Sequence, residues 1–429
     1  MIDTTEGTVE AAKVPLFDRH HIFSREMLRY LGPAFLVSVG YMDPGNWATS
    51  IDGGARFGYD LLWVILLSNM MAVLLQSLSA KLGIATGRDL AQNCREHFSK
   101  PVAMGMWVTA ELAMIATDLA EFLGAALGIY LLFHISLLSA VFITAADVFI
   151  ILWLQKYGFR PLEYVIITFV SVIGASYVIE LFFARPDWAS IPYHVVVPQI
   201  TSESIFVAIG ILGATVMPHN LYLHSNLIRS RVAADAPFPK KKRTYAFAII
   251  DSIVALNGAW FVNSSILIMA AGAFAARGMN VASIEEAHTT LRHLFGNFSS
   301  MIFAAALLAS GIASSTTSTM AGQYVMEGFL RVKIRPWLRR IIFRVIVIIP
   351  AVISIASGVD PLNLLVASQV MLSFQLPFAV IPLILFTRNE AMMGPLRNVR
   401  ITTVAAVICT AVIIALNMLL VIRTFGVTF

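Results

Sequence analysis

The sequence predicts an all-α polytopic membrane protein with eleven transmembrane helices, arranged as two inverted five-helix repeats and one additional helix. Three observations support this fold class. The chain of 429 residues is 58% hydrophobic and 13% charged, whereas soluble domains carry about 25% charged residues. Its apolar segments have the length that a bilayer requires. Two of these segments, five helices apart, are interrupted at corresponding positions, which is typical of inverted repeats.

Each apolar segment is close to the roughly 20 residues that cross a bilayer. The segments lie at about 31–57, 59–83, 101–133, 135–156, 161–183, 203–229, 244–275, 299–328, 337–357, 361–387 and 400–424. The predicted organisation is an N-terminal segment (1–30), a core (31–387) of two repeats (31–183 and 203–387), and an additional helix (400–424). The polar start shows no cleavable signal peptide, so we expect the first helix to remain as an anchor.

The distribution of Lys and Arg predicts the orientation of the chain. With the N-terminus in the cytoplasm, the inner loops hold most basic residues, including the run 240–243, and the outer loops hold few. This asymmetry follows the positive-inside rule and places the C-terminus outside. Because the residues behind the net charge of +5 are spread among loops, and not gathered on one folded face, we expect no nucleic-acid partner.

The first apolar segment is interrupted by Asp43-Pro44-Gly45-Asn46. Proline removes a helical hydrogen bond and glycine adds backbone freedom, so the helix is expected to break here. A carboxylate at membrane depth is costly and usually marks a pathway or a site. We therefore expect this stretch to form one half of an ion-binding site.

The sixth segment carries a matching interruption, Met217-Pro218-His219-Asn220, with Ala214 three residues before the methionine. A single proline in a membrane helix carries little information, because kinked helices are common there. Two interrupted helices at equivalent positions of inverted repeats indicate a transporter whose substrate site lies near the membrane midplane.

The donor groups at the two interruptions favour a small divalent cation as the substrate. Asp43 offers a carboxylate and Asn46 an amide oxygen, while Ala214 can present a backbone carbonyl and Met217 a thioether sulfur. Magnesium and calcium prefer oxygen ligands, whereas sulfur favours softer transition metals. The alternative for Met217 is apolar packing, the ordinary role of a methionine in a core.

A polar route is indicated by Glu111, Asp118 and Glu121 in the third segment, whose spacings of seven and three residues place them on one helical face. Three acids inside one span are costly and indicate function. Arg339 and Arg340 begin the ninth segment. Paired with the acids, they would form a network that passes protons; the alternatives are arginines that extend to the membrane surface and a polar interior with a structural role only.

At these residues the sequence resembles the Nramp family of proton-coupled divalent metal transporters, particularly its bacterial MntH-type manganese transporters. The Asp-Pro-Gly-Asn and Met-Pro-His-Asn motifs match, and residues 321–330 (AGQYVMEGFL) resemble the transport signature of that family. The resemblance covers essentially the whole chain. It implies a LeuT-like fold with alternating access, in a bacterial plasma (inner) membrane.

The resemblance also implies a set of metal ligands. These are Asp43, Asn46, Met217 and the Ala214 carbonyl, with Gln369 in the tenth helix and the Gly40 carbonyl as further candidates. The implied proton pathway includes Asp43, His219, Glu121, Asp118, Glu111, Arg339 and Arg340. The expected ion pairs are Asp118 with Arg340 and Glu121 with Arg339. His219 would lie between the metal site and this network, and His224 is a candidate gate or relay.

The predicted function is secondary active uptake of divalent transition-metal ions, with Mn²⁺ first and Fe²⁺, Co²⁺ and Cd²⁺ after it, coupled to proton entry. The expected partners are the lipid bilayer, the metal ion and protons, with no permanently bound cofactor and, without a Walker motif, no ATP. The alternatives are a magnesium transporter, which Met217 disfavours, an amino-acid or other organic-solute transporter, and a metal channel. No nucleophile–base constellation is visible, so we expect no enzymatic activity.

Two further patterns concern surfaces and packing. The loop at about 276–298 predicts an amphipathic surface helix with Glu285, Glu286, His288, Arg292 and His293. Its acids and histidines could gather cations, and the alternative is a solvated face. Gly124 and Gly128 have the G-x-x-x-G spacing, which we interpret as helix packing.

Overall fold

The computed structural model describes residues 32–146, 159–279, 281, 283–332 and 335–424, and the regular structure of these residues is helical. The α-helices are α4 (Pro33–Gly40), α5 (Pro44–Phe57), α6 (Leu62–Thr86), α7 (Leu90–His97), α8 (Lys100–Phe133), α9 (Leu137–Thr144), α11 (Phe159–Ala184), α12 (Ile191–Val196), α13 (Ser204–Thr215), α14 (Pro218–Arg229), α15 (Phe238–Ala273), α16 (Ile284–Phe295), α17 (Asn297–Leu330), α18 (Pro336–Ala356), α19 (Pro361–Arg388), α20 (Glu390–Met393) and α21 (Arg400–Thr424). Two 3₁₀ turns, η1 (Ala275–Arg277) and η2 (Gly394–Leu396), complete the set.

Eight helical stretches in the described residues are long and apolar enough to cross a membrane: Leu62–Thr86, Lys100–Phe133, Ile167–Ala184, Ser204–Arg229, Phe238–Arg277, Asn297–Leu330, Pro361–Arg388 and Arg400–Leu419. Each corresponds to one of the predicted segments. Of the other three predictions, 31–57 is divided between α4 and α5, 135–156 extends beyond the described residues, and 337–357 is α18, which begins with several arginines. The predicted count of eleven stays a prediction.

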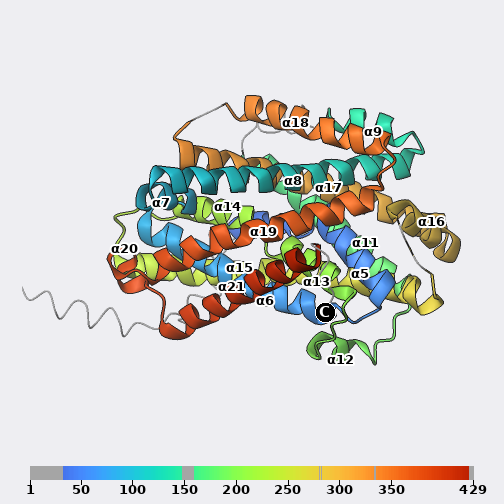
Figure 1. The fold of residues 1–429 in the computed structure, drawn as a ribbon, viewed down its shortest axis with the longest axis horizontal. Coiled ribbons are helices and arrows are strands. Elements are labelled where there is room, and N and C mark those ends of the chain that lie inside the picture. Colours follow the sequence, from blue (N-terminus) through green and yellow to red (C-terminus); the bar gives the residue numbers. More distant parts are fainter. Residues whose placement is uncertain (1–31, 147–158, 280, 282, 333–334, 425–429) are drawn as a thin grey trace, which may run out of the picture.

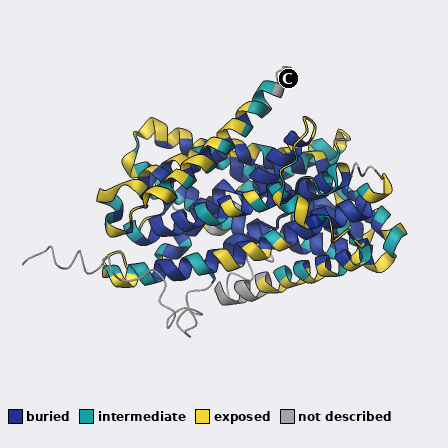
Figure 2. Cartoon of the chain, turned by 90° about the horizontal axis from the view of Figure 1, so that it is seen from below, coloured by how far each residue is buried: buried dark blue, intermediate teal, exposed yellow. Residues whose placement is uncertain are grey.

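The long helices α8, α17 and α19 run along the long axis of the molecule (Figure 1), and α5 and α13 both pack against α19. Buried residues fill the middle of the bundle, while exposed residues occupy the outer helix faces (Figure 2). Many of these outer residues are large and apolar, including Phe182, which is 78% exposed, and Ile401, which is 83% exposed. Such a surface suits contact with lipid acyl chains.

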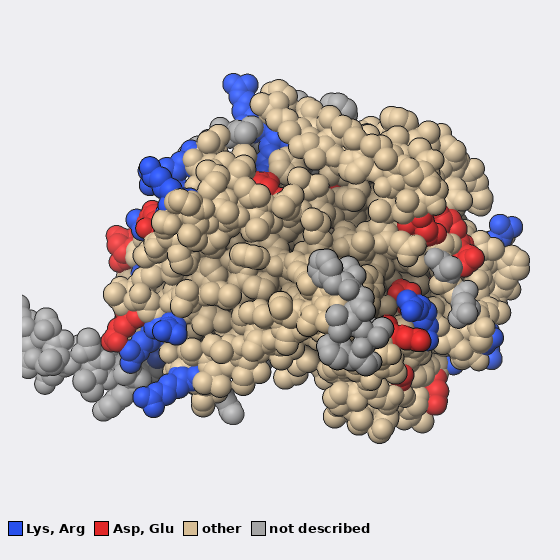
Figure 3. All heavy atoms as spheres, in the orientation of Figure 1, with Lys and Arg blue, Asp and Glu red and all other residues tan. Residues whose placement is uncertain are grey.

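Charged side chains are concentrated toward the two ends of the long axis on the face shown in Figure 3. The band between them is almost free of Lys, Arg, Asp and Glu on this face. That band is the surface expected to face the hydrocarbon core, because charges at that depth are costly. Which end faces the cytoplasm stays a prediction.

Close packing of α8 depends on its glycines. A Cβ added at Gly128 would lie 2.7 Å from the backbone nitrogen of Leu308 in α17, so the two helices touch at this position. A Cβ added at Gly124 would lie 2.1 Å from the ring of Pro44, the first residue of α5. The predicted packing role of the G-x-x-x-G spacing is confirmed. The second contact adds that Gly124 forms a notch for the proline of the first interruption.

Candidate functional site

The first interruption ends one helix and begins another. After α4 ends at Gly40, Asp43 adopts an extended backbone and becomes the N-cap of α5, its Oδ1 accepting a hydrogen bond of 2.8 Å from the backbone N–H of Asn46. Pro44 follows in the first turn, where a backbone N–H has no helical partner and its loss costs little. The predicted break is confirmed, and the residues at the break have the pattern of a helix N-terminus, with an N-cap followed by proline.

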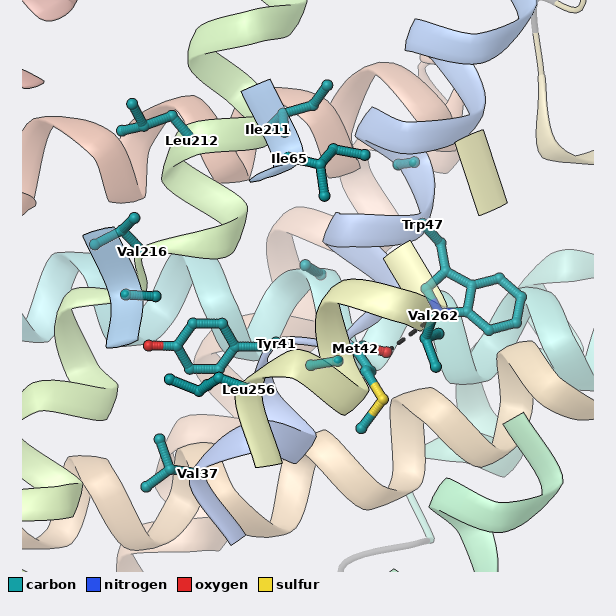
Figure 4. Close-up of a cluster of buried hydrophobic side chains, with 14 of the residues drawn as sticks. Val37, Tyr41, Met42, Trp47, Ile65, Ile211, Leu212, Val216, Leu256 and Val262 are labelled. Carbon is teal, nitrogen blue, oxygen red and sulfur yellow. Dashed lines mark hydrogen bonds between the residues drawn. The ribbon is translucent and has the colours of Figure 1, made fainter. Parts of the chain in front are cut away.

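Neighbouring helices bind the carbonyl groups that this break frees. The Met42 carbonyl accepts hydrogen bonds from Ser310 Oγ at 2.5 Å and from Trp47 Nε1 at 3.2 Å, and the Tyr41 carbonyl accepts one from Asn263 Nδ2 at 2.8 Å. Figure 4 shows the bond from Trp47 to Met42 among the apolar side chains that surround the break. Buried carbonyls without partners would be costly, so these bonds help to hold the unwound segment in one conformation.

The second interruption has the same construction. Helix α13 ends at Thr215, Met217 is the extended N-cap residue of α14, and Pro218 again stands in the first turn. The predicted break in the sixth segment is therefore confirmed. Met217 is fully buried, and its sulfur lies 3.6 Å from the side-chain nitrogen of Asn220.

The two interruptions meet through Asn46. Its Nδ2 donates to Asp43 Oδ1 at 2.8 Å and to the Ala214 carbonyl at 3.0 Å, so it bridges the two half-helices. The other carboxylate oxygen, Asp43 Oδ2, is buried and has no hydrogen-bond partner in the described part of the chain. Asp43, Asn46 and the Ala214 carbonyl, three of the predicted ligands, thus lie together, and Asp43 contributes an unpaired carboxyl oxygen.

Gln369 of α19 lies against both interruptions. A Cβ added at Gly45 would lie 1.8 Å from Gln369 Nε2, and one added at Gly213 would lie 2.2 Å from the Gln369 backbone carbonyl. Gln369 Nε2 donates to Ser368 Oγ at 2.9 Å, and its Oε1 is buried without a described partner. Gly45 in the first interruption and Gly213 near the end of α13 leave space for Gln369, which adds an unpaired oxygen to the same region.

The structure assigns different surroundings to the two histidines. Both ring nitrogens of His219 are buried without hydrogen-bond partners among the described residues, so no direct hydrogen bond joins His219 to the acids of α8. His224 Nδ1 lies 3.0 Å from Gln76 Oε1, and Gln76 Nε2 donates to the Tyr41 hydroxyl at 2.8 Å. These contacts connect α14, which carries His224, to Tyr41 in the unwound segment between α4 and α5.

The acids of α8 form two groups. Ser318 Oγ of α17 lies 2.6 Å from Asp118 Oδ1 and 2.5 Å from Glu121 Oε2. Glu111 forms an ion pair of 2.9 Å with Arg339 and also accepts a hydrogen bond of 3.1 Å from Trp107. Because a serine hydroxyl carries one proton, both Ser318 contacts can be hydrogen bonds only if one carboxyl group is itself protonated.

The predicted pair of Glu121 with Arg339 is wrong. Arg339 pairs with Glu111 instead, because Glu111 lies ten residues, about 15 Å, nearer the start of α8, level with the first turn of α18. The side chain of Arg340 lies outside the described residues, so its predicted pair with Asp118 stays a prediction.

A small pocket beside the acids joins α8, α17 and α18. It is lined by Met114, Asp118, Ser315, Ser318, Thr319, Gly322, Arg339, Phe343, Arg344 and Val347. The guanidinium of Arg344 lies 4.8 Å from the Phe122 ring centre, and its Nη2 lies 3.3 Å from Ser315 Oγ. The three helices thus enclose a polar interior containing acids, arginines and hydroxyl groups.

Two interrupted helices whose breaks meet inside a bundle of membrane-spanning helices define a membrane protein of LeuT-like fold, as predicted. The chain belongs to the Nramp family: the family described as natural resistance-associated macrophage protein-like matches residues 34–423. It is therefore an integral membrane protein, and the family predicted from the two motifs is confirmed.

Curated relatives and solved structures agree with this assignment. The chain is 47% identical over 397 residues to the divalent metal cation transporter MntH of Caldanaerobacter subterraneus subsp. tengcongensis, covering 92% of this chain and 93% of that protein. It is 50% identical over 406 residues to the MntH protein of a Nostoc species, covering 92% and 91%. A mutant of the manganese transporter of Eremococcus coleocola matches with TM-score 0.87 and 36% identity, covering 96% and 90%.

More distant structures share the fold alone. The nucleobase-cation-symport-1 family transporter Mhp1 in a closed conformation matches with TM-score 0.59 and 15% identity, covering 97% of this chain and 98% of that chain. MhsT in complex with L-phenylalanine matches with TM-score 0.60 and 14% identity, covering 93% and 100%.

Proposed function

We propose that this chain takes up divalent transition-metal ions, Mn²⁺ foremost, with proton entry as the driving force. The observation that carries the proposal is the meeting of Asp43, Asn46 and the Ala214 carbonyl where two half-helices end and begin. Relatives named as divalent metal cation transporters, at 47% and 50% identity, support the choice of substrate. Fe²⁺, Co²⁺ and Cd²⁺ are the further substrates that we propose.

The donor set suits such an ion. Asp43 Oδ2 and Gln369 Oε1 are buried oxygens without described partners. Met217, in the second interruption, adds a buried sulfur that lies 3.6 Å from Asn220 Nδ2. Hard oxygen together with one soft sulfur favours manganese, iron, cobalt and cadmium over magnesium and calcium. We propose Asp43, Asn46, Met217 and the Ala214 carbonyl as ligands, with Gln369 joining them in part of the cycle.

Asn46 must change its hydrogen bonds when the ion binds. Its Nδ2 now stands between Asp43 Oδ1 and the Ala214 carbonyl, while its Oδ1 lies 3.3 Å from Asn263 Nδ2. A cation held by the same two oxygens would replace the amide N–H groups, and rotation of the side-chain amide would bring its oxygen toward the ion. Asn46 therefore places a neutral donor at the position where the substrate would carry its charge.

Protons would pass through the polar interior between α8, α17 and α18. We propose that Asp43 and the acid pair of Asp118 and Glu121 hold protons during the cycle, and that Ser318 joins the two acids. We propose that this route continues through the ion pair of Glu111 with Arg339, toward the end of the molecule where α8 and α18 begin. The roles of His219, His224 and Arg340 rest on the resemblance and stay proposals.

The remaining proposals concern organisation and place. The core would consist of inverted repeats at 31–183 and 203–387, with 400–424 as an additional helix. The N-terminus would lie in the cytoplasm and the C-terminus outside, in a bacterial plasma membrane. Alternating access of the two interrupted helices would move the ion without ATP, without a bound cofactor and without enzymatic chemistry.

Uptake by purified protein in liposomes tests the function. With an inward proton gradient, we expect saturable Mn²⁺ accumulation above the external concentration, together with acidification inside; protein-free liposomes are the control. Cd²⁺ should compete, and excess Mg²⁺ should not. Equal competition by Mg²⁺ would identify a magnesium transporter. Metal-independent uptake of an amino acid would identify an organic-solute transporter. Uptake that only equilibrates Mn²⁺ would identify a channel.

A further inference from the structure

A second polar pocket lies away from the proposed metal site, where the end of α8, the short helix α16 and the start of α17 meet. It has a volume of about 280 Å³ and is lined by Leu131, Leu132, His134, His288, Arg292, Asn297, Ser300 and Met301. Glu285 and Glu286 of α16 do not line it. The groups facing this pocket are thus basic or neutral, although the helix as a whole carries acids.

The pocket concentrates positive charge. Arg292 lines it and forms no ion pair with the carboxylates of the described residues. Helix α17 begins beside it at Asn297, and no side chain caps that helix. The free N–H groups and the dipole of a helix of 34 residues therefore add positive potential to the guanidinium.

His288 is a second, independent feature of this pocket that points to a ligand. Its side chain is only 8% exposed and lines the pocket, yet neither ring nitrogen forms a hydrogen bond with a described residue. Burial, and then the charges of His134 and Arg292, lower the pKa of His288. A neutral imidazole that is buried against a cation, without a partner, has a donor and an acceptor site available for a ligand.

We propose that this pocket binds a phosphate-type oxyanion, supplied either by a lipid headgroup or by free inorganic phosphate. Arg292 offers the planar pair of N–H groups that matches two oxygens of a phosphate, and the start of α17 offers backbone N–H groups. A divalent cation would be repelled by the same groups. This site is separate from the transport route and does not depend on the proposed function.

The walls of the pocket are compatible with a lipid. Leu131, Leu132 and Met301 form its apolar side, and Met301 is 54% exposed. A phospholipid could therefore place its phosphate beside Arg292 and its acyl chains along α8 and α17. Free phosphate would use the same polar groups without the apolar wall, so the two sources can be separated by experiment.

The test is the thermal stability of the purified full-length protein in detergent, followed by tryptophan fluorescence. The probes are sodium phosphate against sodium chloride at equal ionic strength, and dihexanoylphosphatidylglycerol against uncharged dihexanoylglycerol. We expect at least one phosphate source to raise the melting temperature of the wild type by several degrees. Arg292→Gln and His288→Gln should lose most of this shift. Arg185→Gln, which removes an arginine outside the pocket, should retain it.

The outcomes separate the possibilities. A rise in melting temperature with phosphatidylglycerol alone identifies a lipid as the ligand, and a rise with phosphate alone identifies a free anion. Either result agrees with the proposal. No shift with either probe, an equal shift with chloride, or a full shift in Arg292→Gln overturns it. If Arg292→Gln does not fold, Asn297→Asp, which adds a carboxylate at the edge of the pocket, must abolish the shift for the proposal to stand.

Discussion

The side-chain nitrogen of Asn46 lies 3.0 Å from the carbonyl oxygen of Ala214, a residue 168 positions later in the chain. The same nitrogen lies 2.8 Å from Asp43 Oδ1. One amide therefore bridges both interrupted helices and occupies the place between two oxygens that a cation would share. Under the proposed function, binding of the ion would release this amide, so the affinity for the metal would depend on how easily Asn46 rotates.

Replacing Met217 by Ala tests the sulfur ligand. We expect uptake of Cd²⁺ and Mn²⁺ to lose affinity roughly tenfold, about 1.4 kcal/mol, while any transport of Mg²⁺ or Ca²⁺ changes less. The measurement is the apparent affinity for each ion in liposomes. Met393→Ala, which removes a buried methionine from the distant helix α20, is the matched control. Unchanged selectivity would remove sulfur from the site.

Asp43→Asn tests the coupling between metal and proton. The variant removes the charge while keeping the shape, so we expect metal-driven acidification of the liposome interior to disappear. Asp52→Asn changes an acid of the same half-helix and should retain acidification. Normal proton entry in Asp43→Asn would place the coupling group elsewhere in the protein.

Gly45→Ala tests the close approach of α19 to the first interruption. The added Cβ would lie 1.8 Å from Gln369 Nε2, so Gln369 must move. We expect a loss of stability of about 1–3 kcal/mol, typical of overpacking, and slower metal uptake. Adding Gln369→Ala should restore the stability but not the uptake. Gly174→Ala, where an added Cβ meets nothing within 4 Å, should leave both unchanged.

Ser318→Ala tests the bridge between two acids of α8. Without the hydroxyl, Asp118 and Glu121 lose the group that lies 2.6 and 2.5 Å from them. We expect proton entry to slow severalfold while metal binding, measured by Cd²⁺ affinity, changes little. Ser314→Ala on the same helix removes a hydroxyl that bonds only to backbone carbonyls and is the control. Equal loss of binding and proton entry in Ser318→Ala would indicate a structural role.

His288→Gln tests the electrostatics of the pocket where α8, α16 and α17 meet. Burial, followed by His134 and Arg292, lowers the pKa of His288 below its ordinary value of 6.5, so the folded protein favours the neutral ring. The stability contributed by this group is complete above about pH 6.5 and is lost as the pH falls below it. In phosphate-free chloride buffer, the melting temperature of His288→Gln should decrease less between pH 7 and 5 than that of the wild type. His293→Gln on the same helix should follow the wild type.

Much of the fold could be predicted because it depends on local features of the sequence. Apolar length indicates the spans, and proline with glycine indicates where two of them break. The correspondence between the interrupted segments 31–57 and 203–229 could be predicted because each is the first helix of a five-helix half of the chain. The residues that hold the breaks could not be predicted, since Asn263, Ser310 and Gln76 resemble ordinary polar residues of membrane helices until their partners are known.

The three acids of α8 show what residue spacing alone cannot predict. Helical periodicity correctly places Glu111, Asp118 and Glu121 on one helix, but it does not give their height relative to another helix. Arg339 therefore pairs with Glu111 and not with Glu121. Ser318 lies in a run of serine and threonine residues at 314–319, and only its contacts with both acids distinguish it from its neighbours.

The notch at Gly124 has a mechanical consequence. The ring of Pro44 fills the space that a side chain at Gly124 would occupy, so translation of α5 toward the start of α8 would press the ring against Ala120, one turn away, which has a Cβ. Translation the other way would bring the ring to Gly128, where Leu308 of α17 already fills the space. The notch therefore acts as a stop that resists sliding of the first interruption along α8.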